Sequence, residues 1–88
     1  MNTIISLMNT IERWLLTYRN ARKIAGDNTN TLEVQIVNEE IAEGVAAEIE
    51  KLLTNIDRRY ERLLASGNET SELLSLITRA GQISDEVE

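Results

Sequence analysis

Four carboxylates at regular spacing are the residues of this chain best placed to do chemistry. Glu43, Glu50 and Asp57 recur every seven residues, and Glu40 precedes the first of them by three. Residues three or seven apart lie on one side of an α-helix, so these four residues form one acidic face. Such a face is typical of a solvated helix surface, and it also suits docking into the basic groove of a nucleic-acid-binding protein.

Binding of a divalent metal ion is the other function that these carboxylates suggest. Glu39 and Glu43 are four residues apart, a spacing that places two oxygen ligands on one side of a helix. The chain has no histidine, however, and therefore lacks the Glu-x-x-His pattern used by metal centres in helical bundles. We predict no metal and no other cofactor.

Two basic stretches suggest anion binding. TYRNARK (residues 17–23) carries three cations near the end of a predicted helix, where they offset the negative end of the helix dipole. DRRYERL (residues 57–63) carries three arginines around a tyrosine, a set that suits a small anionic ligand held between two copies of the chain. Acidic residues are interleaved in this second stretch and the net charge is −6, so we predict no direct nucleic-acid binding.

The composition removes most catalytic chemistry. There is no histidine to act as a base and no cysteine to act as a nucleophile, and the four glycines are too dispersed for a phosphate-binding loop. Because only carboxylates, hydroxyls, lysine and arginine remain, we predict that the protein is not an enzyme. The lack of cysteine also excludes a disulfide.

The length of 88 residues predicts one small domain. A single core of this size supplies only about 3–5 kcal/mol, so association with another chain is a natural supplement. The first residues lack the basic segment of a secretory signal, and no apolar run approaches the ~20 residues that cross a bilayer. These features predict a cytoplasmic protein without membrane association.

Heptad periodicity predicts a first helix over residues 3–25. The tetrapeptide Met-Asn-Thr-Ile occurs twice, seven residues apart, which places Ile4 and Ile11 at equivalent positions on one side of that helix. A capping box that begins at Asn9 offers a second interpretation, in which residues 1–8 form a loose arm.

A second, long helix is predicted over residues 32–65. The connection GDNTNT (residues 26–31) separates it from the first, with Gly26 suited to a left-handed conformation and Asn30 to the N-cap of the next helix. The stretch TLEVQIVN (residues 31–38) alternates like a strand. The helical period continues through it and a lone strand would have no partner, so the helix is favoured.

A third, short helix is predicted over residues 70–80. Ser66-Gly67-Asn68 ends the second helix, and Gly81 is expected to end the third. Residues 1–81 are thus predicted to form a single helical domain, followed by a frayed acidic tail at residues 82–88.

These elements predict an all-α fold in which two flanking helices pack antiparallel to a long central one. Residues 1–26 carry a net charge of +3 and residues 27–57 carry −7, so the first two helices would be charge-complementary. Several apolar side chains do not fit on the shared faces, which predicts a homodimer or a higher assembly. The residues predicted to contact a second copy or another protein are Trp14, Leu16, Ile36, Leu53 and Leu64.

Together these features predict a non-enzymatic helical interaction module that self-associates and acts by occupying a partner protein. One alternative is a small acidic inhibitor, of the kind that phages and mobile elements encode, whose acidic face blocks a basic site on a host protein. A second alternative is a small helical chaperone for a secreted or assembling subunit. The surplus of apolar surface and the lack of a catalytic constellation favour the first.

Overall fold

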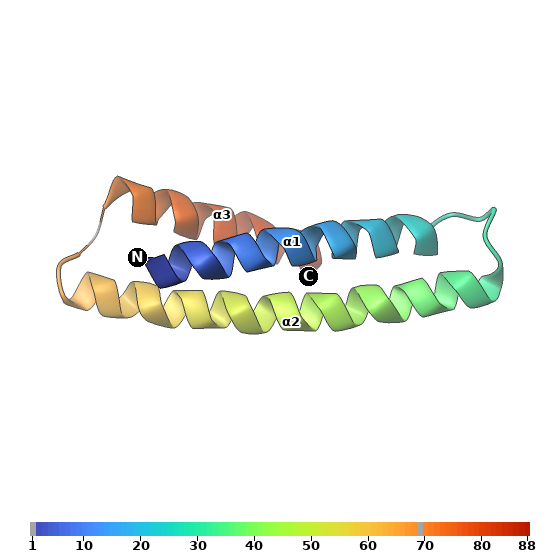
Figure 1. The fold of residues 1–88 in the computed structure, drawn as a ribbon, viewed down its shortest axis with the longest axis horizontal. Coiled ribbons are helices and arrows are strands. Elements are labelled where there is room, and N and C mark those ends of the chain that lie inside the picture. The colour runs from blue at the N-terminus through green and yellow to red at the C-terminus, as the bar shows by residue number, and fades with distance from the viewer. Residues whose placement is uncertain (1, 69) are drawn as a thin grey trace.

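The computed structural model describes residues 2–68 and 70–88, and the described chain is almost entirely helical. Helix α1 spans Asn2–Ala25, α2 spans Leu32–Ala65 and α3 spans Ser71–Val87. Both α1 and α3 run antiparallel to the long α2 and hence parallel to each other (Figure 1). The predicted all-α class, with two helices flanking a long central one, is confirmed.

Helix α1 is continuous from its first turn, so the alternative of a loose arm is wrong. Ile4 and Met8 are buried, at 1% and 4% exposure, and Ile11 is fully buried. The repeated tetrapeptide therefore places two equivalent isoleucines in the core. Burial of this first apolar turn outweighs the capping signal at Asn9, which lies inside the helix.

The turn residues differ from the predicted ones at two positions. Thr31, not Asn30, caps α2, because its hydroxyl accepts a hydrogen bond from the Val34 amide at 3.3 Å. The side-chain amide of Asn30 instead donates to the carbonyl of Ile24 at 3.2 Å and so ties the connection back to α1. The left-handed conformation predicted after the first helix is found after the second, at Gly67, with a φ of 76°.

The core is a single apolar cluster to which all three helices contribute. Ile49 and Ile56 of α2 are fully buried, and they lie in the same cluster as Leu15 of α1 and Leu73 of α3. A fully buried aliphatic side chain of this kind contributes roughly 1.5–3 kcal/mol relative to an exposed one. The cluster therefore holds both flanking helices on α2.

Helix α3 is longer than predicted, and the predicted acidic tail is its last part. The helix continues past Gly81 to Val87. Ile83 is fully buried and Val87 is 8% exposed, so both side chains belong to the core. Leu73, Ala80, Ile83 and Val87 follow steps of seven, three and four residues, which keeps them on one side of the helix. Their burial outweighs the ~1 kcal/mol that a glycine costs inside a helix.

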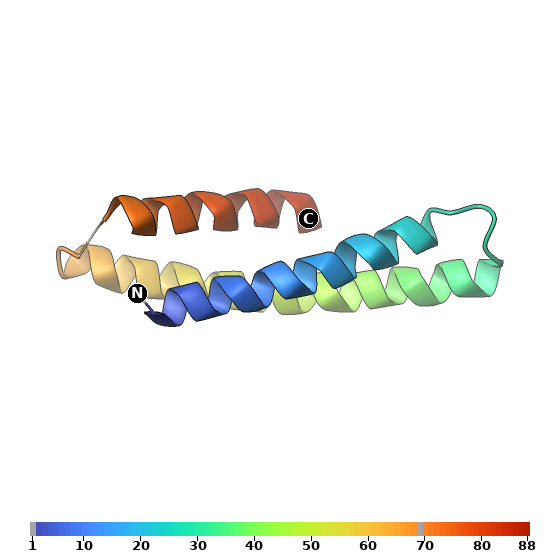
Figure 2. The ribbon, with the colours of Figure 1, turned by 45° about the horizontal axis from the view of Figure 1, so that its top comes forward.

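The molecule is a rod of 53 × 18 × 18 Å that α3 covers only in part (Figure 2). Helix α3 ends beside Tyr18 and Ala42, which line one hollow together with Val87. Beyond that point α1 and α2 continue as a two-helix arm, residues 18–41, without a third helix against them. The arm is thus the part of the molecule with the least helical cover.

Two reciprocal ion pairs set the register of α1 against α3. Arg79 donates from Nε and Nη2 to the two carboxylate oxygens of Glu12, at 2.7 and 3.1 Å. Arg19 donates in the same two-pronged manner to Glu86, at 2.7 Å for both contacts. Within the described residues, α1 forms its ion pairs with α3 and not with α2 as its charge suggested. These hydrogen bonds hold the pKa values of Glu12 and Glu86 below their ordinary value.

Reversing one of these charges is expected to loosen α3. Arg79→Glu places a second carboxylate against Glu12, while the double variant Glu12→Arg/Arg79→Glu restores an attractive pair. Both side chains are about 40% exposed, at 38% and 42%, so solvent screening limits the effect to about 1 kcal/mol or less. Amide hydrogen exchange in α3 measures this effect of the charge reversal. Equal exchange in the single and the double variant would contradict a role for this pair.

The same ion pairs predict a pH dependence of α3 docking. Because the folded-state pKa values of Glu12 and Glu86 are lowered, their stabilising contribution is present above the ordinary carboxylate pKa. It is lost as the pH falls through the lowered values, when the carboxylates become protonated. Exchange of α3 amides should therefore accelerate as the pH falls below the ordinary carboxylate pKa of 4.5, beyond its intrinsic pH dependence, and less so in Glu12→Gln.

Candidate interaction surfaces

The apolar residues predicted to contact a partner do not form one surface. Leu53 is 5% exposed and belongs to the core, so its assignment to an interface is wrong. It lines a hollow with Ile77 and Ala80, because α3 covers that side of α2. The other four predicted interface residues remain at least 39% exposed, namely Trp14, Leu16, Ile36 and Leu64.

Trp14 lies on the side of α1 that faces away from α3. It is two residues from Glu12, which contacts α3, and two residues are about 200° of helical rotation. Leu16, by contrast, lies between Glu12 and Arg19 on the α3 side, where it is 65% exposed. The two residues therefore belong to opposite sides of α1.

Three apolar residues of α2 extend the surface that Trp14 begins. Val34, Val37 and Ile41 are three and four residues apart, so they form one stripe on the arm. Ile41 is nine residues, or about two and a half turns, from Glu50, which accepts a hydrogen bond from Ser84 of α3 at 3.5 Å. The stripe thus also faces away from α3. We call Trp14, Val34, Val37 and Ile41 the apolar face.

The apolar face is a surface that sequence reasoning found only in part. Within this face the sequence predicted a partner contact at Trp14 only, yet its three α2 residues are also exposed, at 39% to 46%. The positions of the arm directed at α1 include Gln35 and Asn38, which are half-buried. Because α2 crosses α1 at an angle, the line of contact leaves the apolar stripe as the arm is approached (Figure 2).

Three carboxylates of α2 border the apolar face, namely Glu33, Glu40 and Glu48. On α2 the stripe ends at Glu48, one heptad after Ile41, and the carboxylate of Glu48 pairs with Lys51 at 3.2 Å. Gly44 lies on the same side, three residues after Ile41. A Cβ added to Gly44 would meet no atom within 4 Å, so this glycine lies in open space and not at a close contact between helices.

The predicted acidic face is divided between open surface and a hollow against α3. Glu40 and Glu43 are exposed, whereas Glu50 is half-buried. Glu50 and Asp57 line a hollow of about 300 Å³ together with Asp85 of α3. Asp85 was missed because it lies in the segment predicted to be frayed. Over the residues that the structure describes, no group of three or more acidic side chains is close enough to hold a metal ion.

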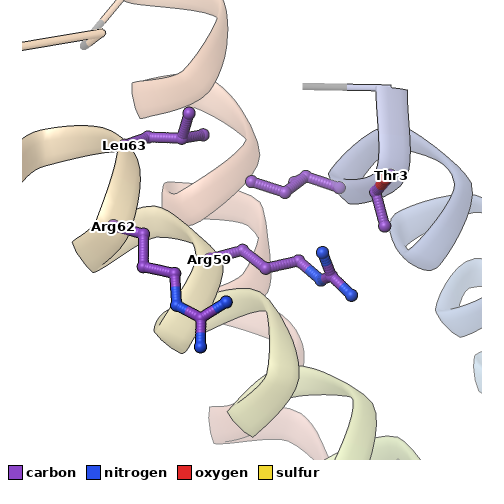
Figure 3. A pocket seen from close by; sticks show the side chains of 5 residues that line it. Thr3, Arg59, Arg62 and Leu63 are labelled. Atoms are coloured by element: carbon purple, nitrogen blue, oxygen red, sulfur yellow. The ribbon is translucent and has the colours of Figure 1, made fainter. Parts of the chain in front are cut away.

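Two of the three arginines predicted to bind an anion line one hollow. Arg59 and Arg62 line an open hollow of about 190 Å³ between α2 and the first turn of α1, together with Thr3 and Leu63. In Figure 3 the side chain of Arg59 extends toward Thr3, whereas that of Arg62 takes a different direction. Arg59 donates to the side chain of Asn55 at 2.9 Å. Both arginines are exposed, so water would screen their attraction for an anion.

The cations of the first basic stretch have acidic neighbours within the same chain. Arg19 pairs with Glu86, and Arg22 lines hollows that include Glu43, Glu88 and Glu39. This surface is therefore balanced in charge and does not form a basic patch.

None of the three helices, over residues 2–68 and 70–88, has an apolar stretch long enough to cross a bilayer. No protein-family model matches this chain, and no curated protein or solved structure matches it significantly.

Proposed function

We propose that this chain is a non-enzymatic helical interaction module that self-associates and acts by occupying a partner protein. The observation that carries the proposal is the apolar face, four large side chains between 39% and 46% exposed. Exposed apolar residues gathered on one side of a small protein are typical of protein-binding surfaces, because burying them releases ordered water.

The position of the apolar face supports the same function. Val34, Val37 and Ile41 lie on the arm, and Trp14 lies on α1 just before it, all on the side away from α3, so another chain reaches this face without displacing any helix. Trp14 is its largest residue, and aromatic side chains carry much of the energy in protein interfaces.

A small acidic inhibitor is the second candidate function, and the acidic face supports it. Glu50, Asp57 and Asp85 line a hollow to which the structure assigns no lysine or arginine, and Glu43 is exposed on the same side of α2. A basic side chain of a partner would find uncompensated carboxylates there. Burial of apolar surface contributes more to most associations, so the acidic inhibitor ranks second.

Site-specific photo-crosslinking in cells of the source organism tests the proposed function. A crosslinker at Val37 probes the apolar face, one at Glu43 probes the acidic face, and one at the exposed Ser75 of α3 is the control. We expect a protein other than this chain, which competes with a second copy for the apolar face, to be captured from Val37 and not from Ser75. Capture from Glu43 alone, abolished by Glu50→Lys with Asp57→Lys and by raised salt, would identify the acidic inhibitor instead.

Crosslinks to no other protein from either Val37 or Glu43 would contradict occupation of a partner. The apolar and the acidic modes also differ in purified complexes. Binding through the apolar face should persist at 0.5 M salt, where screening acts within about 4–5 Å. Reversal of Glu43, Glu50 and Asp57 to lysine should leave it intact.

A further inference from the structure

We propose that the apolar face binds a second copy of this chain, forming a two-fold symmetric dimer in which the two arms make a four-helix bundle. This inference rests on the proposed function, of which it names the self-association surface and its partner. In such a dimer the same patch of both copies meets itself, so Trp14, Val34, Val37 and Ile41 of each copy are buried together.

The first argument is the shape of the single chain. Its radius of gyration is 15.6 Å, whereas a compact domain of this length has about 12 Å. Its accessible surface is 5822 Å², about 600 Å² more than the ~5,200 Å² expected for a compact monomer of 9.9 kDa. A standard protein interface takes about 800 Å² from each partner. The surplus is thus close to what one stable dimer contact buries.

The second argument is that the arm lacks a third helix. Helix α3 ends beside Tyr18 and Ala42, and the arm beyond has only two helices. Two helices leave most of their surface open to water, and a four-helix bundle buries such surface in a core between facing helices. A second arm provides the two missing helices without requiring α3 to move.

The third argument is charge, which favours a second copy on this face over the other faces. The chain carries −6, so two copies repel each other wherever their acidic surfaces meet. Of the carboxylates that border the apolar face, Glu48 is paired with Lys51. Glu33 and Glu40 lie at the edge beside Val37. The rest of the acidic face lies on another side of α2, since Ile41 is about half a turn round from Glu50. Contact through the apolar face therefore keeps Glu43, Glu50 and Asp57 of the two copies apart.

Sedimentation velocity of the purified chain, over about 1–200 µM, tests the dimer. We expect the mass to rise toward twice 9.9 kDa with concentration. Val37→Lys places a charge in the contact and should raise the dissociation constant at least about thirty-fold, as for an interface hot spot. Val37 is 46% exposed in the monomer, so helicity should not change, and Ile41→Lys supplies a second variant on the same face.

Ile36→Lys is the matched control, since Ile36 is 47% exposed and lies beside the acidic face rather than on the apolar face. Its dissociation constant should stay within a few-fold of the unmodified chain. The single tryptophan gives an independent signal: Trp14 emission should shift to the red on dilution of the unmodified chain and not of Val37→Lys.

A chain that stays at 9.9 kDa throughout would overturn the proposal, as would an assembly larger than two copies. Equal weakening by Ile36→Lys and Val37→Lys would also overturn it, because the contact would then lie elsewhere. A monomeric chain that still crosslinks another protein from Val37 would remove the dimer and leave occupation of a partner standing. A dimer whose Val37 crosslinks to no other protein would support self-association and contradict occupation of a partner.

Discussion

Replacing Ile49 by alanine is expected to unfold a large part of the population at room temperature. Ile49 lies at the middle of α2, is fully buried and belongs to the cluster that joins all three helices. Deleting a buried isoleucine side chain to alanine costs about 2–5 kcal/mol in other cores. A single core of this size supplies only about 3–5 kcal/mol, so one such cavity consumes most of the stability.

Urea unfolding followed by far-UV circular dichroism measures this loss, with all variants at one protein concentration because a dimer adds stability. Ile36→Ala is the matched control. It makes the same chemical change in the same helix at a side chain that is 47% exposed, and should change the free energy of unfolding by about 0.5 kcal/mol or less. Similar losses in the two variants would contradict the core described here.

Ile83→Ala is expected to have the second-largest effect. It also distinguishes the helix that the structure shows at the last residues from a frayed tail. A frayed tail at residues 82–88 would tolerate this change. In the structure Ile83 is fully buried within α3 and Val87 follows it into the core. The free energy of unfolding should again fall by about 2–5 kcal/mol. Local unfolding should begin in α3, because that helix has the fewest neighbours.

Hydrogen exchange of the amides of residues 81–87, together with urea unfolding, checks this result. Protection in that segment should fall in Ile83→Ala by more than protection in α1 falls. Asp85→Ala, an exposed change two residues away in the same helix, should leave the protection in place. Rapid exchange of residues 81–87 in the unmodified chain would show that the segment is frayed.

The sequence by itself determined the number of helices, their order and most of their ends. Helical periodicity and turn chemistry are local properties, and they placed the second helix at residues 32–65, the bounds that α2 has. The same local signals identified the connection before α2 and the break near Gly67. They also limited the available chemistry, because the chain lacks histidine and cysteine.

The tertiary structure alone decided which side of each helix is covered. Leu53 is buried because α3 packs over it, and α3 continues through Gly81 because Ile83 and Val87 find a core there. Neither outcome follows from local propensity, since burial depends on which neighbour reaches a given turn.

The ion pairs and the apolar face were likewise decided by the packing of the helices. Glu12 and Arg79 are 67 residues apart, so only the parallel packing of α1 and α3 brings them together. Val34, Val37 and Ile41 are apolar positions of α2, and they stay exposed because they lie on the side of α2 that faces away from α3. The chain's own pattern thus makes the helices amphipathic, whereas their lengths and crossing determine which apolar residues are left for another molecule.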